Sequence, residues 1–194
     1  MNNKNMDALY QVVKAPFKKG YSHTGEAVLD RRHEKVINSI REYQTFLEVG
    51  PGNGKTALWF LEHDKKIELV DITEKHLQEF FRYINGKDEV KLHLLKTASD
   101  WKEIPDNSFD VVYALEVIEH VPRWKELLDQ MLRVAIKKVV ITTPVGKSFW
   151  DPGHVNFFSL EDFAYLDADI EEIITKELDK IIGSSCFFME IHCE

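Results

Sequence analysis

Two separate stretches of the sequence carry side chains that could do acid–base or metal chemistry. Glu116, Glu119 and His120 follow an apolar segment, and His154 lies in an aromatic loop further along the chain. A neutral imidazole titrates near physiological pH, so either histidine could be a general base. Two carboxylates and two histidines could instead ligate a divalent metal ion. In a purely structural alternative, Glu119 complements a helix N-terminus and His154 fixes its loop by hydrogen bonds.

A glycine-rich turn is the second feature with chemical meaning. Gly50, Gly52 and Gly54 stand at alternate positions, after the apolar run 46–49 and before a segment with helical character. Strand, glycine turn and helix are typical of the ligand-binding corner of an open α/β sheet. A dinucleotide site has the spacing G-x-G-x-x-G, whereas here the third glycine comes one residue earlier. Glu48, which precedes the glycines, favours a cationic ligand over a pyrophosphate.

The turn resembles the first motif of the class I S-adenosylmethionine-dependent methyltransferases, (E/D)-x-G-x-G-x-G, and matches it at every fixed position. Residues 116–121 also resemble the E-x-(I/L)-E-H-(V/L) motif common in this class. Residues 154–159 resemble its H-x-x-F-(F/W)-(S/T) passage at the substrate mouth. The resemblance implies S-adenosylmethionine as the cofactor, and it places Glu119, His120 and His154 at the catalytic end of the site.

Two further carboxylates complete the expected cofactor site. Asp71 follows an apolar run about 20 residues after the glycines, where a carboxylate can accept both hydroxyls of a ribose. The alternative for Asp71 is a helix cap, although Thr73 suits that role better. The resemblance makes Asp100 the acceptor for the adenine amino group, with Ser99 or Trp101 beside the ring, although Trp101 could be a core aromatic. The implied cofactor-binding residues are Glu48, Gly50, Pro51, Gly52, Asn53, Gly54, Asp71, Ile72, Ser99, Asp100, Trp101, Leu115 and Glu116.

The remaining pattern predicts the elements that position these residues. Short apolar runs predict strands at 46–49, 67–70, 90–95, 109–115, 137–144, 170–178 and 186–192. Helical spacing predicts helices at 26–40, 56–61, 73–84, 122–132 and 159–166, the last with a Ser-x-x-Asp capping box. This order implies an α/β fold: a doubly wound, mostly parallel, seven-stranded Rossmann-like sheet with a closing antiparallel strand. Ligands of such sheets lie outside the carboxyl ends of the strands.

The length of 194 residues suits one domain with a full core. We expect a single methyltransferase domain over 1–194, in which residues 1–42 form an N-terminal helical cap or lid. An ordinary surface helix is an equal alternative for this segment. Arg31 or Arg32 could meet the methionine carboxylate of the cofactor, and nothing in the sequence selects either.

The composition of the chain limits the kinds of partner that we expect it to bind. The net charge of −8 argues against a large nucleic-acid surface. No apolar run approaches the ~20 residues of a membrane span, so we expect no membrane partner. The N-terminus has no apolar signal core, and the two cysteines, Cys186 and Cys193, have no metal-knuckle spacing. These features predict a cytoplasmic protein.

Together the motifs predict methyl transfer from S-adenosylmethionine to an acceptor that the sequence does not identify, an oxygen or nitrogen of a small molecule. One alternative is an RNA 2′-O-methyltransferase with a metal-assisted site, because the E-x-x-E-H … H pattern also resembles the small-RNA 2′-O-methyltransferases. Another is a non-catalytic S-adenosylmethionine-binding module. Binding of cofactor without turnover against any acceptor would distinguish the module from an enzyme.

Overall fold

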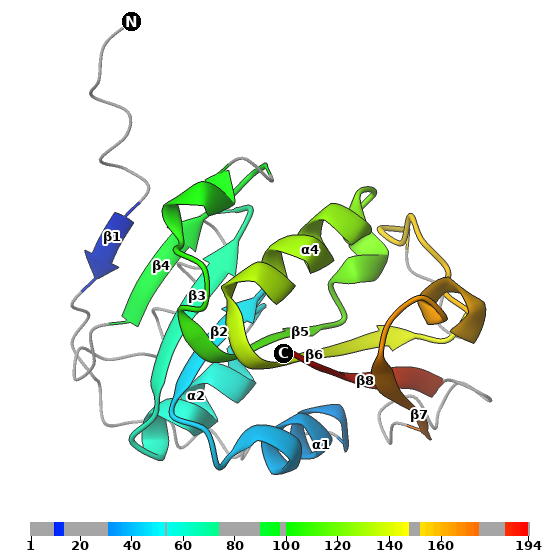
Figure 1. Ribbon diagram of the computed structural model, residues 1–194, viewed down its shortest axis with the longest axis horizontal. Helices are drawn as coiled ribbons and strands as arrows, with labels where there is room; N and C mark the ends of the chain where they lie inside the picture. Colours follow the sequence, from blue (N-terminus) through cyan, green and yellow to red (C-terminus); the bar gives the residue numbers. More distant parts are fainter. Residues whose placement is uncertain are drawn as a thin grey trace, which may run out of the picture.

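The computed structural model describes residues 10–13, 31–52, 54–73, 90–97, 100–147, 152–174 and 185–193. In these ranges eight strands form one sheet in the order β1-β4-β3-β2-β5-β6-β8-β7 (Figure 1). The strands are β1 (Tyr10–Val13), β2 (Thr45–Val49), β3 (Lys66–Asp71), β4 (Val90–Leu94), β5 (Phe109–Leu115), β6 (Ala135–Pro144), β7 (Ala168–Ile174) and β8 (Ser185–His192). Strands β2 to β6 are mutually parallel, whereas β8 runs antiparallel to both β6 and β7.

The α/β class and the mostly parallel sheet with an antiparallel closing strand are as predicted. Strand β1 was not predicted, and it extends the expected seven strands by pairing antiparallel with β4. The central strands are mostly buried, because helices cover both faces of the sheet. Within the described ranges the α-helices are α1 (Arg31–Ile40), α2 (Lys55–Glu62) and α4 (Trp124–Val134), and the 3-10 turns are η2 (Asp100–Glu103), η3 (Ile118–His120) and η4 (Leu160–Phe163).

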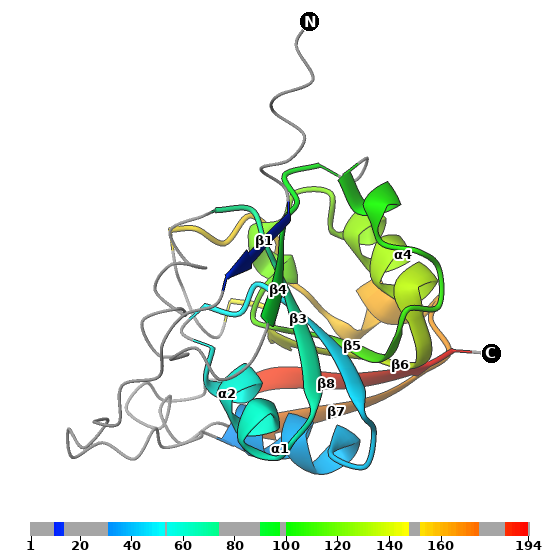
Figure 2. The same cartoon turned by 90° about the vertical axis from the view of Figure 1, so that its left-hand side faces the viewer.

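Successive residues of a strand pack into different cores, one on each face of the sheet. Phe46 of β2 belongs to the core under α1 and α2, where its ring stacks on Phe60 with centroids 4.2 Å apart. Leu47, the next residue, belongs to the core under α4 with Leu128 and Met131. The views in Figures 1 and 2 agree that α4 covers one face while α1 and α2 cover the other. Burial on both faces fixes the strand register and therefore the place of each residue at the strand ends.

Four predicted helices differ from the structure or lie partly or almost wholly outside its described part. Helix α4 begins at Trp124 with Arg123 as its N-cap, so Pro122 precedes the helix instead of standing in its first turn. The capping box of Ser159 and Asp162 is present, but it begins only the short turn η4, because the chain turns into β7 soon afterwards. The helix predicted over 73–84 falls almost entirely outside the described residues, as do residues 26–30 of the first predicted helix. No helix within the described ranges is long and apolar enough to cross a membrane.

Candidate cofactor and acceptor site

A cavity of about 300 Å³ lies at the carboxyl ends of β2 and β5, beside the glycine turn. Its lining is Arg32, His33, Glu48, Gly50, Pro51, Gly52, Lys55, Leu115 and Glu116. Six of these residues, from Glu48 to Gly52 and at 115–116, belong to the cofactor-binding set predicted from the sequence. The structure therefore brings the core of that set together at the sheet edge where such folds bind ligands.

Gly50 and Gly52 of the glycine turn have different structural roles. Gly50 has a φ of 65°, and a Cβ at this position would lie 2.6 Å from Cγ2 of Val117. Gly52 also has a positive φ, 53°, but a Cβ there would meet nothing within 4 Å. Gly50 is thus required by packing, whereas Gly52 keeps space open in front of the cavity.

Glu48 is a buried acid that faces this cavity. Its side chain is 3% exposed, and its Oε2 accepts no hydrogen bond from the described residues. Burial raises the pKa of Glu48 to about 8, although the Tyr113 hydroxyl and the Ala57 N–H offset part of the rise. Buried polar atoms without partners are rare in proteins. A ligand that brings positive charge or hydrogen-bond donors, as the ammonium and sulfonium of S-adenosylmethionine do, fits this carboxyl group.

Asp71 lies at the carboxyl end of β3, next to the same edge. Its Oδ1 accepts the Thr73 N–H at 2.8 Å and the Thr73 hydroxyl at 3.3 Å, so one carboxylate oxygen stabilises the turn that follows β3. The neighbouring Ile72 is 63% exposed. An acidic residue beside exposed apolar surface suits a ribose with its attached base, and the ribose role of Asp71 stays a prediction.

The residues predicted to bind adenine are placed less favourably for contact with a ligand. Oδ2 of Asp100 accepts the backbone N–H groups of Lys96 and Thr97, at 2.9 and 2.7 Å, and so holds its own loop together. Trp101 is only 3% exposed and packs in the core under α4, which leaves little of its ring for a ligand. Ser99 and Asn53 lie outside the described residues.

The three predicted catalytic residues come together although they are far apart in the sequence. One ligand atom each of Glu119, His120 and His154 lies within 4.8 Å of the others. The two imidazole rings meet edge to face, with centroids 4.7 Å apart. Nδ1 of His120 donates to the Gly153 carbonyl at 3.0 Å, which orients the ring and leaves Nε2 for other partners.

The loop that carries His154 is attached to η3 by hydrogen bonds. The backbone N–H groups of Val155 and Asn156 both donate to the Glu119 carbonyl, at 2.9 and 3.0 Å. The Asn156 amide donates to the carbonyls of Ile118 and Val121, at 2.9 and 2.7 Å. Asn156 was not among the predicted site residues, and only its position beside His154 could have suggested it.

Glu119 is the buried member of the three. Its side chain is 1% exposed, Oε2 accepts the Thr143 hydroxyl at 3.1 Å, and Oε1 has no partner among the described residues. Burial, followed by the nearby charge of Glu116, raises the pKa of Glu119 to about 8. A carboxyl group in this setting either holds a proton or faces a cation.

Arg32 is a site residue that the sequence could not select. Its Nη1 lies 3.2 Å from Oε2 of Glu116, whereas the neighbouring Arg31 donates to the Ile174 carbonyl of β7 at 3.2 Å. Only Arg32 lines the cavity. Glu116 is also one of three non-glycine residues in the described ranges with a positive φ, here 55°.

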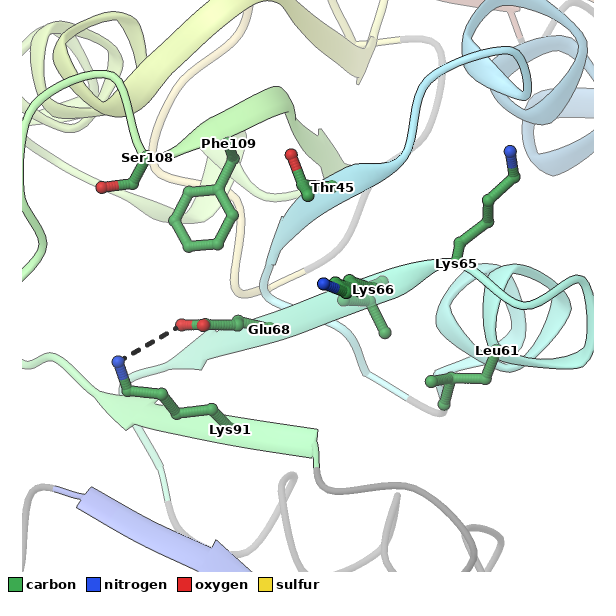
Figure 3. Close-up of a pocket in the computed structure, with 9 residues that line it drawn as sticks. Thr45, Leu61, Lys65, Lys66, Glu68, Lys91, Ser108 and Phe109 are labelled. Atoms are coloured by element: carbon green, nitrogen blue, oxygen red, sulfur yellow. Dashed lines mark ion pairs between the residues drawn. The ribbon is translucent and has the colours of Figure 1, made fainter.

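A second cavity, of about 390 Å³, lies at the opposite edge of the sheet, near the amino ends of β2, β3 and β5. Figure 3 shows its mixed charges, with Lys91 turned toward Glu68 at an Nζ–Oε2 distance of 3.6 Å. Glu68 also meets Nε2 of His93 at 2.5 Å. None of the predicted site residues lines this cavity. The residues predicted to do chemistry therefore lie at the carboxyl edge instead.

The fold and the cavity define a doubly wound α/β domain with a ligand site at its carboxyl edge. Residues 47–142 match a family model described as a methyltransferase domain. This match confirms the resemblance of the motifs to the S-adenosylmethionine-dependent methyltransferases, and the fold agrees with it. No curated protein matches the sequence.

Solved structures support the fold. Phosphoethanolamine N-methyltransferase 2 of Haemonchus contortus, in complex with phosphomonomethylethanolamine and S-adenosylhomocysteine, is similar with a TM-score of 0.59 and 17% identity, over 78% of this chain and 50% of that one. This chain thus spans about half the length of that enzyme. The YcgJ protein of Bacillus subtilis has a TM-score of 0.66 and 16% identity, over 84% and 98% of the two chains. The [4+2]-cyclase SpnF has a TM-score of 0.66 and 13% identity, over 94% and 87%. At these identities the likeness establishes the fold and not the substrate.

Proposed function

We propose that the protein transfers the methyl group of S-adenosylmethionine to an oxygen or nitrogen of a small-molecule acceptor. The observation that carries this proposal is the meeting of Glu119, His120 and His154 beside the cavity of the glycine turn. One region offers a buried acid to a cationic cofactor, and the adjoining region offers groups that can handle the proton of an acceptor.

The cofactor would lie along the carboxyl edge of β2 and β3. Glu48 would face its positive charge, Gly52 would leave room for it, and the Asp71 carboxylate would accept hydrogen bonds from the ribose hydroxyls. When bound, S-adenosylmethionine supplies a methyl group made electrophilic by the sulfonium. The chain's own task is to hold the acceptor in line with that methyl group and to exclude water.

The second region would remove the proton of the acceptor. His120 is 42% exposed at its side chain, and Gly153 holds its Nδ1, so Nε2 can take a proton from a hydroxyl or an N–H group. Alternatively, Glu119, His120 and His154 hold a divalent cation that binds the acceptor oxygen. The donor set of one carboxylate and two imidazoles suits Zn²⁺, Fe²⁺ or Mn²⁺.

Turnover of S-adenosylmethionine against pools of metabolites, with and without a chelator, tests the proposal. His120→Ala and His154→Ala should each reduce turnover at least tenfold while cofactor binding is unchanged, because neither histidine lines the cofactor cavity. His192→Ala is the matched control, since His192 lies at the far end of β8 beside Asp169. Loss of wild-type activity with chelator identifies a metal, and chelator-resistant activity identifies a base. Full activity in both histidine variants would remove this cluster from the mechanism.

A second candidate, methylation of an RNA 2′-hydroxyl, rests on the same cluster of potential metal ligands. An RNA pool in the same screen tests it, and salt-sensitive RNA binding with metal-dependent turnover would replace the small-molecule acceptor. For the location of the reaction we keep the cytoplasm as our proposal.

A further inference from the structure

The ion pair between Arg32 and Glu116 occupies the cavity in which we place the cofactor. Both side chains line this cavity, and both are mostly shielded from water, with exposures of 17% and 21%. Arg32 comes from α1, which packs on one face of the sheet, and Glu116 directly follows β5. The pair therefore joins the N-terminal helix to the sheet across the proposed binding site.

A guanidinium is the side chain best suited to a carboxylate, because its planar N–H groups can donate two parallel hydrogen bonds. In the structure the carboxylate that it meets belongs to the chain itself. The methionine part of S-adenosylmethionine carries a carboxylate of the same kind. A ligand that enters this cavity with its carboxylate toward α1 must share Arg32 with Glu116 or displace it.

Glu116 stands in an unusual position for one half of an ion pair. Its backbone has a φ of 55°, in the left-handed region that costs an ordinary residue conformational energy. Its charge also lies close enough to Glu119 for the two carboxyl groups to influence each other's protonation. Arg32 therefore faces two neighbouring acids, and a ligand carboxylate that enters the cavity competes with Glu116 for the same guanidinium.

We propose that Arg32 binds the carboxylate of the cofactor, and that Glu116 is a built-in competitor that holds this guanidinium until the cofactor displaces it. This inference rests on the proposed function, and it changes the sequence-based expectation that Glu116 binds the cofactor directly. Loading of the cofactor then frees the Glu116 charge beside Glu119, at the acceptor end of the site.

Two ligands separate the carboxylate from the rest of the cofactor. S-adenosylhomocysteine carries the amino-acid part, whereas 5′-methylthioadenosine has the same nucleoside and thioether without it. Calorimetry with both ligands on the wild type, Arg32→Met, Glu116→Gln and the double variant measures the role of each residue. Arg31→Met is the matched control, because Arg31 is the adjacent arginine of α1 but binds the Ile174 carbonyl. Thermal unfolding of each variant checks that the fold is kept.

We expect Arg32→Met to weaken S-adenosylhomocysteine about tenfold and to leave 5′-methylthioadenosine unchanged. Glu116→Gln should tighten S-adenosylhomocysteine about threefold, because a competitor reduces apparent affinity by the fraction of sites it occupies. In the double variant this gain should vanish, since there is no guanidinium left to compete for. Arg31→Met should bind both ligands as the wild type does.

Three results would overturn the inference. Weaker binding of S-adenosylhomocysteine by Glu116→Gln would make Glu116 a direct ligand of the cofactor. Equal losses for both ligands in Arg32→Met, or equal losses in the two arginine variants, would make the role of Arg32 structural. A wild type that binds neither ligand contradicts the proposed function itself, so the two failures are distinguishable.

Discussion

Gly50→Ala and Gly52→Ala form a matched pair that tests the geometry of the glycine turn. Both residues have φ values in the left-handed region, 65° and 53°, which costs alanine about 1–2 kcal/mol. At Gly50 the new Cβ would also lie 2.6 Å from Cγ2 of Val117, a β-branched side chain with restricted rotamers. Overpacking of this kind costs about 1–3 kcal/mol more. Gly50→Ala should therefore lose about 2–5 kcal/mol of stability. Gly52→Ala should lose only about 1–2 kcal/mol, the cost of the backbone strain.

Urea unfolding measures the free energies, and thermal unfolding should show a fall in Tm of about 2–4 °C per kcal/mol for a chain of this size. Val117→Ala in the Gly50→Ala background should recover the steric part of the loss and leave the strain. Gly52→Ala should instead weaken S-adenosylhomocysteine about tenfold, because its Cβ would project into open space at the cavity. If the two single variants are equally stable, or if only Gly50→Ala affects ligand binding, the reasoning is wrong.

Asp71→Asn should weaken cofactor binding about tenfold with little change in Tm, since the amide oxygen can still accept the Thr73 N–H; unchanged affinity would leave Asp71 a purely structural role. Burial raises the pKa of Glu48 from 4.5 to about 8, so the free protein keeps this proton at pH 7. The stability that the bound proton contributes is lost as the pH rises toward 8. A cationic ligand favours the carboxylate, so calorimetry in buffers of different ionisation enthalpy should detect proton release at pH 7, and Glu48→Gln should abolish it. Equal proton release by both proteins would assign the proton to another group.

The parts of the site that follow a strand directly were predictable from the sequence. Glu48, the glycines and Asp71 stand at the ends of short apolar runs, and the geometry of parallel sheets brings such ends to one edge. The same rule predicted that Glu119 and His120 lie at this edge, and the structure brings them together with His154 there. What the sequence supplied here was local pattern combined with a general property of the fold.

Residues whose role depends on packing between distant segments were not predictable. Arg31 and Arg32 are adjacent and chemically alike, and only the packing of α1 turns one toward the cavity and the other toward Ile174. Trp101 has the residue type of a ring-stacking partner, yet it lies in the core. Strand β1 is only four residues long, and its pairing with β4 is a long-range contact that leaves no local signal.

The central claim is that the edge cavity is built for S-adenosylmethionine and not for a dinucleotide. Calorimetric titration of the wild-type protein with S-adenosylmethionine and, separately, with NAD tests this claim most directly. The buried Glu48 and the G-x-G-x-G spacing predict saturable binding of S-adenosylmethionine and no measurable heat with NAD. Tight binding of NAD without any heat from S-adenosylmethionine would contradict the account.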